Sequence, residues 1–455
     1  MVIRRFVLSF LLALPTLSGL AHGQDGLEPV LRPSSSFRWF EPAQPEPPTV
    51  TAREGLSVHR EGVLEVGDPL HRVPTIDLTQ DAIDIWDRIR RGFAMTDLDT
   101  ELVTEQQIFY LNRPGFLKQV IERGQRYFFH IVNELERRGM PTELALLPMV
   151  ESAYNPMAYS RAHASGLWQF IPSTGRNYNL TQNAWVDERR DVVASTNAAL
   201  DYLQNIYEMH GDWHLALASY NWGEGAVGRA IQKNQAAGLP TDYASLAMPA
   251  ETRHYVPKLQ ALKNIIARPE LFNVSLPYVP NRPYFVTVES PSNLDLATAA
   301  RMADTPLKEF IALNPAYRKP VIPKGTQSLV VPADKEAVFR ANMADSSPNA
   351  PRWKALEVGA GESLEKIAAR HEISAQELRH INGLAPGARL SDGQTLLVPA
   401  GGGDVEGAMQ AASLLPKQPT ASAPAQGKKG SSSGKAARKG KKPEKAGPAP
   451  KTTKP

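Results

Sequence analysis

The stretch TELALLPMVESAYNP, residues 142–156, decides the fold expected for this chain. Its first part, from Thr142 to Val150, predicts a short, deeply buried helix that Pro148 kinks. Glu151 follows directly, so a carboxyl group stands at the end of an apolar helix. Burial there would penalise the charged form and raise the pKa of the carboxyl. Such an acid can protonate a glycosidic oxygen, although an isolated Glu is more often a structural cap or ion-pair partner.

Helical patterns continue over residues 76–270. Helices are expected where apolar or alanine residues recur at three- and four-residue spacing, at 83–93, 128–135, 194–209 and 213–220. No alternating strand pattern appears in this part of the sequence. Residues 76–270 are therefore expected to form one mostly α domain.

An internal repeat follows this region. Its first copy, residues 283–333, is expected to run strand, helix, helix, strand at 284–288, 296–302, 307–313 and 329–332. Its second copy, residues 353–400, repeats that order at 356–358, 364–370, 375–381 and 396–399. The sequence thus predicts two small α+β (βααβ) modules after the helical domain.

The two ends of the chain have biased compositions. Residues 1–23 resemble a secretory signal peptide, with Arg4 and Arg5 before an apolar run; an uncleaved anchor is the alternative. Residues 24–75 predict a Pro-rich linker. Residues 401–455 predict a disordered, Lys-rich tail.

Charge and cysteine content narrow the possible functions. The net charge is +4, but residues 417–455 hold ten Lys, one Arg and one acidic residue, which leaves 40 basic and 46 acidic residues in 1–416. The folded part is therefore acidic, and a basic nucleic-acid-binding domain is not expected. The absence of Cys excludes disulfides, thiolate–zinc sites and a lipid on an N-terminal Cys.

Polar and aromatic residues suited to a saccharide site lie downstream of Glu151. They are Gln169 within GLWQF, Tyr220 and Asn221 within SYNWG, and the segment ETRHYV at 251–256. Aromatic rings stack on sugar faces, and amide and hydroxyl groups bond sugar substituents.

These segments carry a resemblance to a known family. Glu151-Ser152, Gly166-Leu167-Trp168-Gln169, Tyr220-Asn221 and 251–255 match, in order, the four motifs of the soluble-lytic-transglycosylase-like domain, which has a goose-lysozyme-like helical fold. With Ser160, the surrounding segments 86–90 and 187–191, and the repeats, residues 76–400 resemble the membrane-bound lytic murein transglycosylase D group.

The resemblance implies the chemistry and its residues. The family cleaves the β-1,4 bond between N-acetylmuramic acid and N-acetylglucosamine in peptidoglycan and leaves a 1,6-anhydro ring. Glu151 would act as acid and then as base. The other residues implied at the substrate site are Ser152, Ser160, Gly166, Leu167, Trp168, Gln169, Tyr220, Asn221, Glu251 and Tyr255. Whether Trp168 stacks on substrate or packs in the core stays open.

The second repeat copy closely resembles a LysM domain. The resemblance implies that two loops bind N-acetylglucosamine-containing glycan, through Gly361, Glu362, Ser363, Leu364, Ile381, Asn382 and Gly383. The first copy is degenerate, because residues 290–294 replace the usual loop, and its glycan affinity is doubtful.

Several alternatives stay open beside the enzyme. A hydrolytic muramidase or a non-catalytic peptidoglycan scaffold fits the same sequence. The pair His210 and His214 lacks further metal ligands, and Gly223-x-Gly225-x-x-Gly228 lacks a preceding strand, so neither a metal nor a cofactor is expected. Arg189 and Arg190 predict a salt-bridged surface or a cleft wall.

The expected location is the periplasm, without a Cys-linked lipid anchor. The basic tail predicts either contact with anionic envelope surfaces or a solubilising extension with no partner. The oligomeric state is left open.

Overall fold

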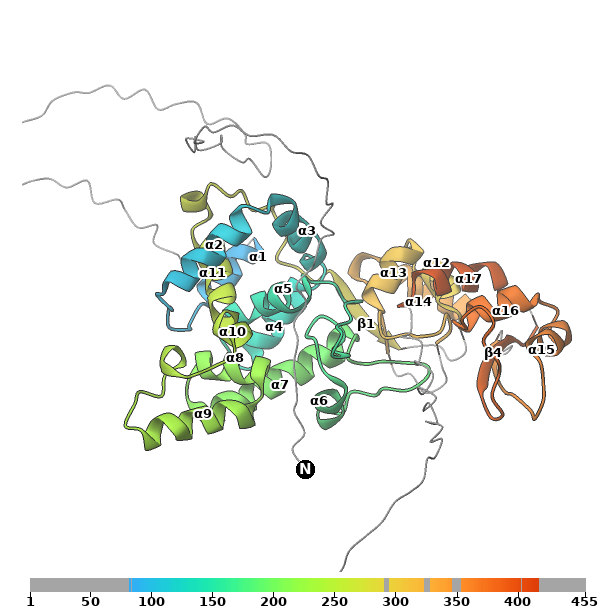
Figure 1. The fold of residues 1–455 in the computed structure, drawn as a ribbon. Coiled ribbons are helices and arrows are strands. Elements are labelled where there is room, and N and C mark those ends of the chain that lie inside the picture. Colours follow the sequence, from blue (N-terminus) through green and yellow to red (C-terminus); the bar gives the residue numbers. More distant parts are fainter. Residues whose placement is uncertain are drawn as a thin grey trace, which may run out of the picture. The chain divides into compact units, whose positions relative to one another are not determined.

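The computed structural model describes residues 82, 84–289, 294–322, 328–345, 353–401 and 403–416. The predicted signal peptide, the whole predicted linker and the basic residues 417–455 lie outside this part of the chain. The first described region is helical, as expected, and Figure 1 shows its helices packed around α5 and α11. Its elements are α1 (Ile85–Arg91), α2 (Glu101–Leu111), α3 (Pro114–Gly124), α4 (Phe128–Arg137), η1 (Thr142–Leu146), α5 (Leu147–Ser152), α6 (Pro172–Asn177), α7 (Val192–His210), α8 (Trp213–Trp222), α9 (Glu224–Ala236), η2 (Tyr243–Ser245), α10 (Ala250–Arg253), α11 (Tyr255–Ala267) and η3 (Pro269–Phe272).

The stretch that carries Glu151 lies in the middle of this helical domain. It is broken into the 3₁₀ helix η1 and the helix α5, rather than forming one kinked helix. Pro148 stands in the first turn of α5, where its missing N–H is not needed. Residues 144–147 are fully buried, and the Tyr154 hydroxyl donates a hydrogen bond to the Ala145 carbonyl, 2.5 Å away. The apolar core thus fixes the direction in which Glu151 leaves α5.

The two repeat modules have the predicted βααβ order. In the first, β1 (Phe285–Glu289) pairs antiparallel with β2 (Ser328–Pro332), and α12 (Leu296–Met302) and α13 (Leu307–Leu313) lie between them. In the second, β3 (Trp353–Glu357) pairs antiparallel with β4 (Thr395–Pro399) around α15 (Leu364–Arg370) and α16 (Ala375–Ile381). The sequence did not predict η4 (Ala333–Lys335) or α14 (Glu336–Asp345), which follow the first module.

One asparagine closes each module in the same way. The Asn314 side chain donates to the Val330 carbonyl and accepts from the Val330 N–H, at 2.7 and 2.9 Å. The Asn382 side chain donates to the Leu397 carbonyl and accepts from the Leu397 N–H, at 2.9 and 2.7 Å. Both asparagines are buried, so each amide ties the end of the second helix to the last strand.

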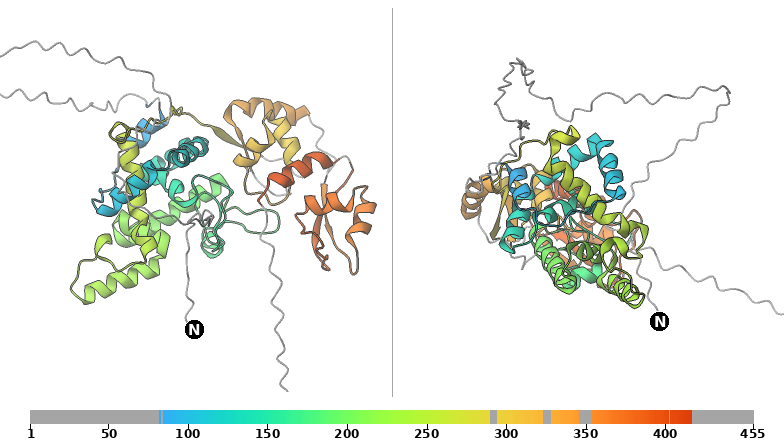
Figure 2. Two further views of the ribbon diagram at one scale, coloured as in Figure 1. Left: turned by 45° about the horizontal axis from the view of Figure 1, so that its top comes forward. Right: turned by 90° about the vertical axis from the view of Figure 1, so that its left-hand side faces the viewer.

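The expected disorder from residue 401 onward is wrong for its first part. Residues 405–414 form α17 (Val405–Leu414), whose N-terminal end is capped by Asp404. Figure 2 shows α17, in red, next to α12 of the first module and α16 of the second. Ala411 and Leu415 are buried in the core of the first module. The apolar face of this short helix is stabilised by packing, which composition alone does not reveal. Of the helices described, none is long and apolar enough to cross a membrane.

Candidate active site

Glu151 lies at the C-terminal end of α5, in the wall of a cleft of about 400 Å³. The residue after α5, Ala153, has a φ of +50°, a left-handed conformation that turns the chain away and leaves the Glu151 side chain half-buried. Four sequence-predicted residues line the same cleft, namely Ser160, Gln169, Tyr220 and Asn221, and residues of α6, α7 and α9 complete it. The fold therefore brings four of the sequence-predicted residues to the cleft of the candidate acid.

The environment of Glu151 keeps a large share of its carboxyl protonated near neutral pH. Burial raises the pKa of its carboxyl from an ordinary 4.5 to about 7. The Tyr255 hydroxyl donates a hydrogen bond to Glu151 Oε1, which lowers the pKa, and the more distant charge of Lys258 acts in the same direction. Glu251, on α10, raises it. Tyr255 itself is buried, so its hydrogen bond reaches the carboxyl from the interior of the protein.

The second motif forms a tight loop, residues 158–170, beside Glu151. Gly166 has a φ of +85°, and a Cβ atom there would lie 1.9 Å from the Arg189 carbonyl oxygen. Only glycine fits this close approach. The Gln169 side chain donates to the Gly166 carbonyl, 2.7 Å away, and Ser160 Oγ accepts from the Ala164 N–H at 3.0 Å. These bonds hold the loop closed.

Several residues predicted at the substrate site make packing contacts or hydrogen bonds within the protein. Trp168 and Leu167 are fully buried, and the Trp168 indole donates to Thr196 Oγ1 at 3.0 Å, so Trp168 packs in the core. Asn221 Oδ1 accepts from the Thr252 hydroxyl at 2.9 Å and ties α8 to α10. Ser152 Oγ donates to the Pro148 carbonyl.

A row of three tyrosines lines the cleft, and the sequence arguments named only one of them, Tyr220. The Tyr202 ring lies between the other two rings. Its centroid is 5.2 Å from that of Tyr178 and 5.3 Å from that of Tyr220. The Tyr202 hydroxyl donates to Glu224 Oε2 at 2.8 Å, and Glu224 also lines the cleft. Helical spacing could have revealed Tyr202, because Tyr202, Asn205 and Met209 recur at three- and four-residue intervals in the alanine-rich α7. All three face the cleft.

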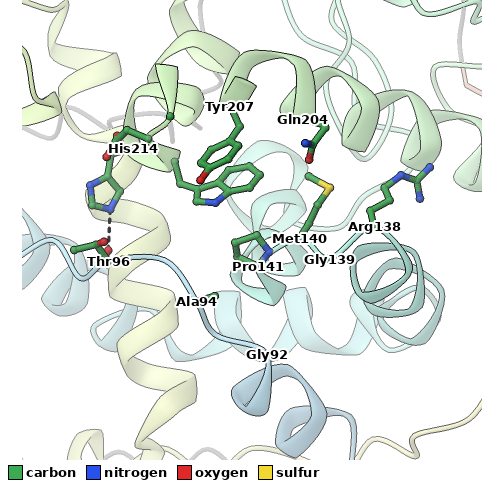
Figure 3. Close-up of a pocket in the computed structure, with 13 residues that line it drawn as sticks. Gly92, Ala94, Thr96, Arg138, Gly139, Met140, Pro141, Gln204, Tyr207 and His214 are labelled. Carbon is green, nitrogen blue, oxygen red and sulfur yellow. Dashed lines mark hydrogen bonds between the residues drawn. The ribbon is translucent and has the colours of Figure 1, made fainter. Parts of the chain in front are cut away.

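A second cavity, about 560 Å³, lies on the opposite side of α7 (Figure 3). Gln204, Tyr207 and Gly211 line it, and Tyr207 stacks on Trp213 with ring centroids 4.3 Å apart. Its acidic lining residue, Asp212, caps α8 by accepting from the Leu215 N–H. This cavity lacks the buried acid of the cleft among its lining residues.

The histidine pair and the glycine pattern weighed in the sequence have other roles in the structure. His214 Nε2 lies 2.9 Å from the Thr96 carbonyl and His210 Nε2 lies 2.9 Å from Ser219 Oγ, so the two imidazoles have separate partners. Within the described residues, no group of three His, Asp or Glu side chains is placed to hold a metal ion. Gly223 begins a helix directly after another helix, not after a strand.

In the second module the predicted glycan-binding residues divide into exposed and buried ones. Gly361 and Gly383 are exposed, and Glu362 and Ser363 are half-buried at the start of α15. Leu364 and Ile381 belong to apolar cores. Asn382 is buried and also accepts from Lys319 Nζ of the first module, at 3.1 Å. Its side chain is therefore occupied by structural bonds.

Comparisons with known proteins match this arrangement. The family model described as the transglycosylase SLT domain matches residues 129–240, the LysM-like domain of lytic transglycosylase MltD matches 284–348, and the LysM domain matches 357–399. Membrane-bound lytic murein transglycosylase D of Escherichia coli (strain K12) is 38% identical over 331 residues, 70% of this chain and 73% of that protein. Membrane-bound lytic murein transglycosylase C of Glaesserella parasuis serovar 5 (strain SH0165) is 29% identical over 166 residues, 32% of this chain and 46% of that protein.

A helical SLT domain with its acid in an aromatic cleft, followed by two LysM-type modules, defines a modular transglycosylase. The similarity to the E. coli protein covers more than two thirds of both chains. The chain belongs to the membrane-bound lytic murein transglycosylase D family.

Proposed function

We propose that this protein is a lytic murein transglycosylase that cleaves the β-1,4 bond between N-acetylmuramic acid and N-acetylglucosamine in peptidoglycan. The observation that carries the proposal is the half-buried Glu151, whose pKa is raised to about 7 inside an aromatic cleft. Membership of the lytic murein transglycosylase D family supports the same substrate. No cofactor takes part in the proposed reaction.

Two proton transfers through Glu151 complete the reaction. The protonated carboxyl gives its proton to the bridging oxygen as the bond from that oxygen to C1 of muramic acid breaks, and N-acetylglucosamine leaves as the alcohol. The carboxylate then takes the proton of the C6 hydroxyl of the same muramic acid as O6 bonds to C1. The 1,6-anhydro ring closes, Glu151 is again protonated, and no water is consumed.

The surrounding residues position the sugars and the acid. The tyrosine row offers stacking surfaces beside Glu151, while Gln169 and Ser160 shape the wall of the cleft. Tyr255 orients the carboxyl by its hydrogen bond to Oε1. Trp168 supports this wall from the core, since its ring is fully buried.

The experiment is digestion of purified sacculi followed by mass spectrometry of the released muropeptides. Wild-type protein is expected to release 1,6-anhydro ends, and folded Glu151→Gln protein is expected to release none. Turnover by the folded Glu151→Gln variant would sink the assignment of the acid. Reducing ends in place of anhydro ends would sink the lytic mechanism.

A hydrolytic muramidase is the second candidate, because Glu224 is another carboxylate in the cleft. Ordinary glycosidases use two carboxylates, one of which activates water or attacks the sugar. Under our proposal Glu224 supports Tyr202 and takes no proton. Glu224→Gln is therefore expected to keep anhydro products and most of the turnover, whereas loss of all products would favour hydrolysis.

We also propose that the second module binds glycan through its exposed loops around Gly361 and Gly383. The match to the LysM domain over residues 357–399 supports this assignment. The cell-wall substrate and the signal-like residues 1–23 together favour a periplasmic location. Contact of the basic residues 417–455 with anionic envelope surfaces belongs to the same proposal.

A further inference from the structure

The segment of residues 183–190 lies between the active-site loop, residues 158–170, and the first repeat module. At its centre is Asp187, a fully buried carboxylate. Burial alone would raise its pKa, but the guanidinium groups of Arg189, Arg190 and Arg318 hold the pKa of Asp187 below its ordinary value. A buried charge of this kind is stable only while its partners stay in place.

Two of these partners bind the active-site loop directly. Arg189 contacts both Asp187 carboxylate oxygens at 2.8 Å and donates from Nη1 to the carbonyls of His163 and Phe170, at 2.7 and 3.1 Å. Arg190 donates from Nε to Ser165 Oγ at 2.9 Å. Both arginines are buried, in contrast to the expected surface or cleft wall. Asp187 thus fixes two cations, and the cations hold both ends of the 163–170 turn.

The third partner comes from the first module. Arg318 Nη2 donates to Asp187 Oδ2 at 3.2 Å, and Nη1 donates to the Asn183 carbonyl at 2.9 Å. The backbones are joined as well, because the Asp187 N–H donates to the Ala316 carbonyl and the Arg318 N–H donates to the Trp185 carbonyl, each at 2.8 Å. The module therefore meets this segment by both main-chain and charged side-chain bonds.

The 183–190 segment also packs against an apolar cluster that both modules and α17 share. Trp185 packs against a cluster formed by residues of the first module, the second module and α17, namely Val321, Trp353, Ile381, Leu397, Ala408, Val405 and Met409. Arg126 and Glu309 add an ion pair between the helical domain and the first module, at 2.6 Å. The 183–190 segment is consequently enclosed by three parts of the chain.

We propose that the first LysM-like module is a brace for the active site and that Arg318 is its positioning residue. Arg318 holds Asp187, Asp187 holds Arg189 and Arg190, and these hold the loop that carries Ser160 and Gln169. The first module thereby supports turnover through its contacts with the 183–190 segment. This inference rests on the proposed function for its turnover measurements. The hydrogen-exchange measurement does not depend on that function.

The test compares full-length Arg318→Met with wild type, with Arg318→Lys as the conservative variant. Arg340→Met is the matched control, since Arg340 forms an exposed ion pair with Glu336 on α14 of the same part of the chain. Amide hydrogen exchange of residues 158–170 is measured beside kcat and KM on soluble glycan, binding to insoluble sacculi, and the thermal unfolding midpoint.

Arg318→Met is expected to accelerate exchange in residues 158–170 and to lower kcat about tenfold, with KM and sacculus binding within about twofold of wild type. Arg318→Lys is expected to recover part of kcat, and Arg340→Met is expected to match wild type. A folded Arg318→Met protein with unchanged loop exchange overturns the proposal, as does a kcat equal to that of the control. An inactive wild type would instead refute the proposed function, and the exchange measurement would still decide this inference.

Discussion

Tyr255 donates a hydrogen bond to Glu151 from 104 positions further along the chain. The first helical turn of α11 thereby supplies the partner of an acid at the last turn of α5. The bond favours the charged carboxylate and opposes burial, which favours the neutral acid. The balance of these two effects sets the pKa of Glu151, the proposed catalytic acid.

Tyr255→Phe should therefore move the pH profile to higher pH. Without the hydroxyl the pKa of Glu151 rises further above about 7, so the protonated acid persists in more alkaline solution. We expect the alkaline limb of kcat/KM to shift upward and kcat to fall, because the carboxyl is less well oriented. The measurement is turnover of a soluble glycan between pH 5 and 9, and an unshifted limb would contradict the proposed role.

Glu151→Gln should stabilise the protein in alkaline but not in acidic solution. The folded-state pKa of Glu151 lies above its ordinary value of 4.5, so the folded state binds more protons between pH 4.5 and about 7, and stability is lost as pH rises through this window. Removing the charge should restore about 3 kcal/mol of unfolding free energy at pH 8 and almost nothing at pH 4. Thermal unfolding at the two pH values checks this, and an equal effect at both would refute it.

Gly166→Ala should be strongly destabilising. Its Cβ atom would collide with the Arg189 carbonyl, and its φ of +85° is unfavourable for alanine. We expect a loss of at least about 2 kcal/mol of stability together with most of the activity. Gly238→Ala is the matched control, because Gly238 has a φ of +66° and open space around it, so it should lose only about 1 kcal/mol. Urea unfolding distinguishes the two, and equal losses would mean that backbone strain alone matters.

Tyr202→Leu should weaken substrate binding more than chemistry. Tyr202 lies between Tyr178 and Tyr220 in the cleft, so its loss interrupts the aromatic row. We expect KM to rise about fivefold with kcat within about twofold of wild type. Tyr207→Leu, on the other side of the same helix, should leave KM unchanged. Steady-state kinetics of both variants is the measurement, and equal KM values would exclude stacking by Tyr202.

Glu362→Lys should reduce binding to sacculi. Glu362 accepts from the Gly359 N–H at 3.0 Å and pairs with Arg370, so charge reversal removes both bonds from the loop before α15. We expect retention on insoluble peptidoglycan to fall about fivefold while turnover of short soluble glycans is unchanged. Glu365→Lys, on the exposed face of α15, controls for charge. Similar retention of both variants would argue against this loop as the glycan site.

Local signals explain why the small modules were predicted well. The helices α12, α13, α15 and α16 begin and end at the predicted residues. Their starts carry strong signals: Asp295 accepts from the Thr298 N–H, Ser363 accepts from the Lys366 N–H, and Ser374 forms a capping box with Glu377. Such bonds depend on neighbours in sequence, which a single chain displays.

Tertiary packing explains what the sequence arguments missed. Asn382 looks like a loop residue, but its amide is used by Leu397 and Lys319 from distant segments. The sequence pattern of Arg189 and Arg190 predicts exposed side chains, but both are buried and form ion pairs with the buried Asp187. The motif order pointed to Glu151, whereas Tyr178 and Tyr202 join the site only through the packing of α6 and α7. Contacts of this kind have no local signature.

The position of α17 bears on the order in which the protein is made and folded. Chains emerge from the ribosome N-terminal end first, and their domains generally fold as units in that order. Yet Ala411 and Leu415 fill the core of a module whose strands end at Pro332. The first module therefore cannot complete its interior until the second has been synthesised. A chain cut by proteolysis before α17 would keep every side chain proposed for catalysis and still lose part of the core of the first module.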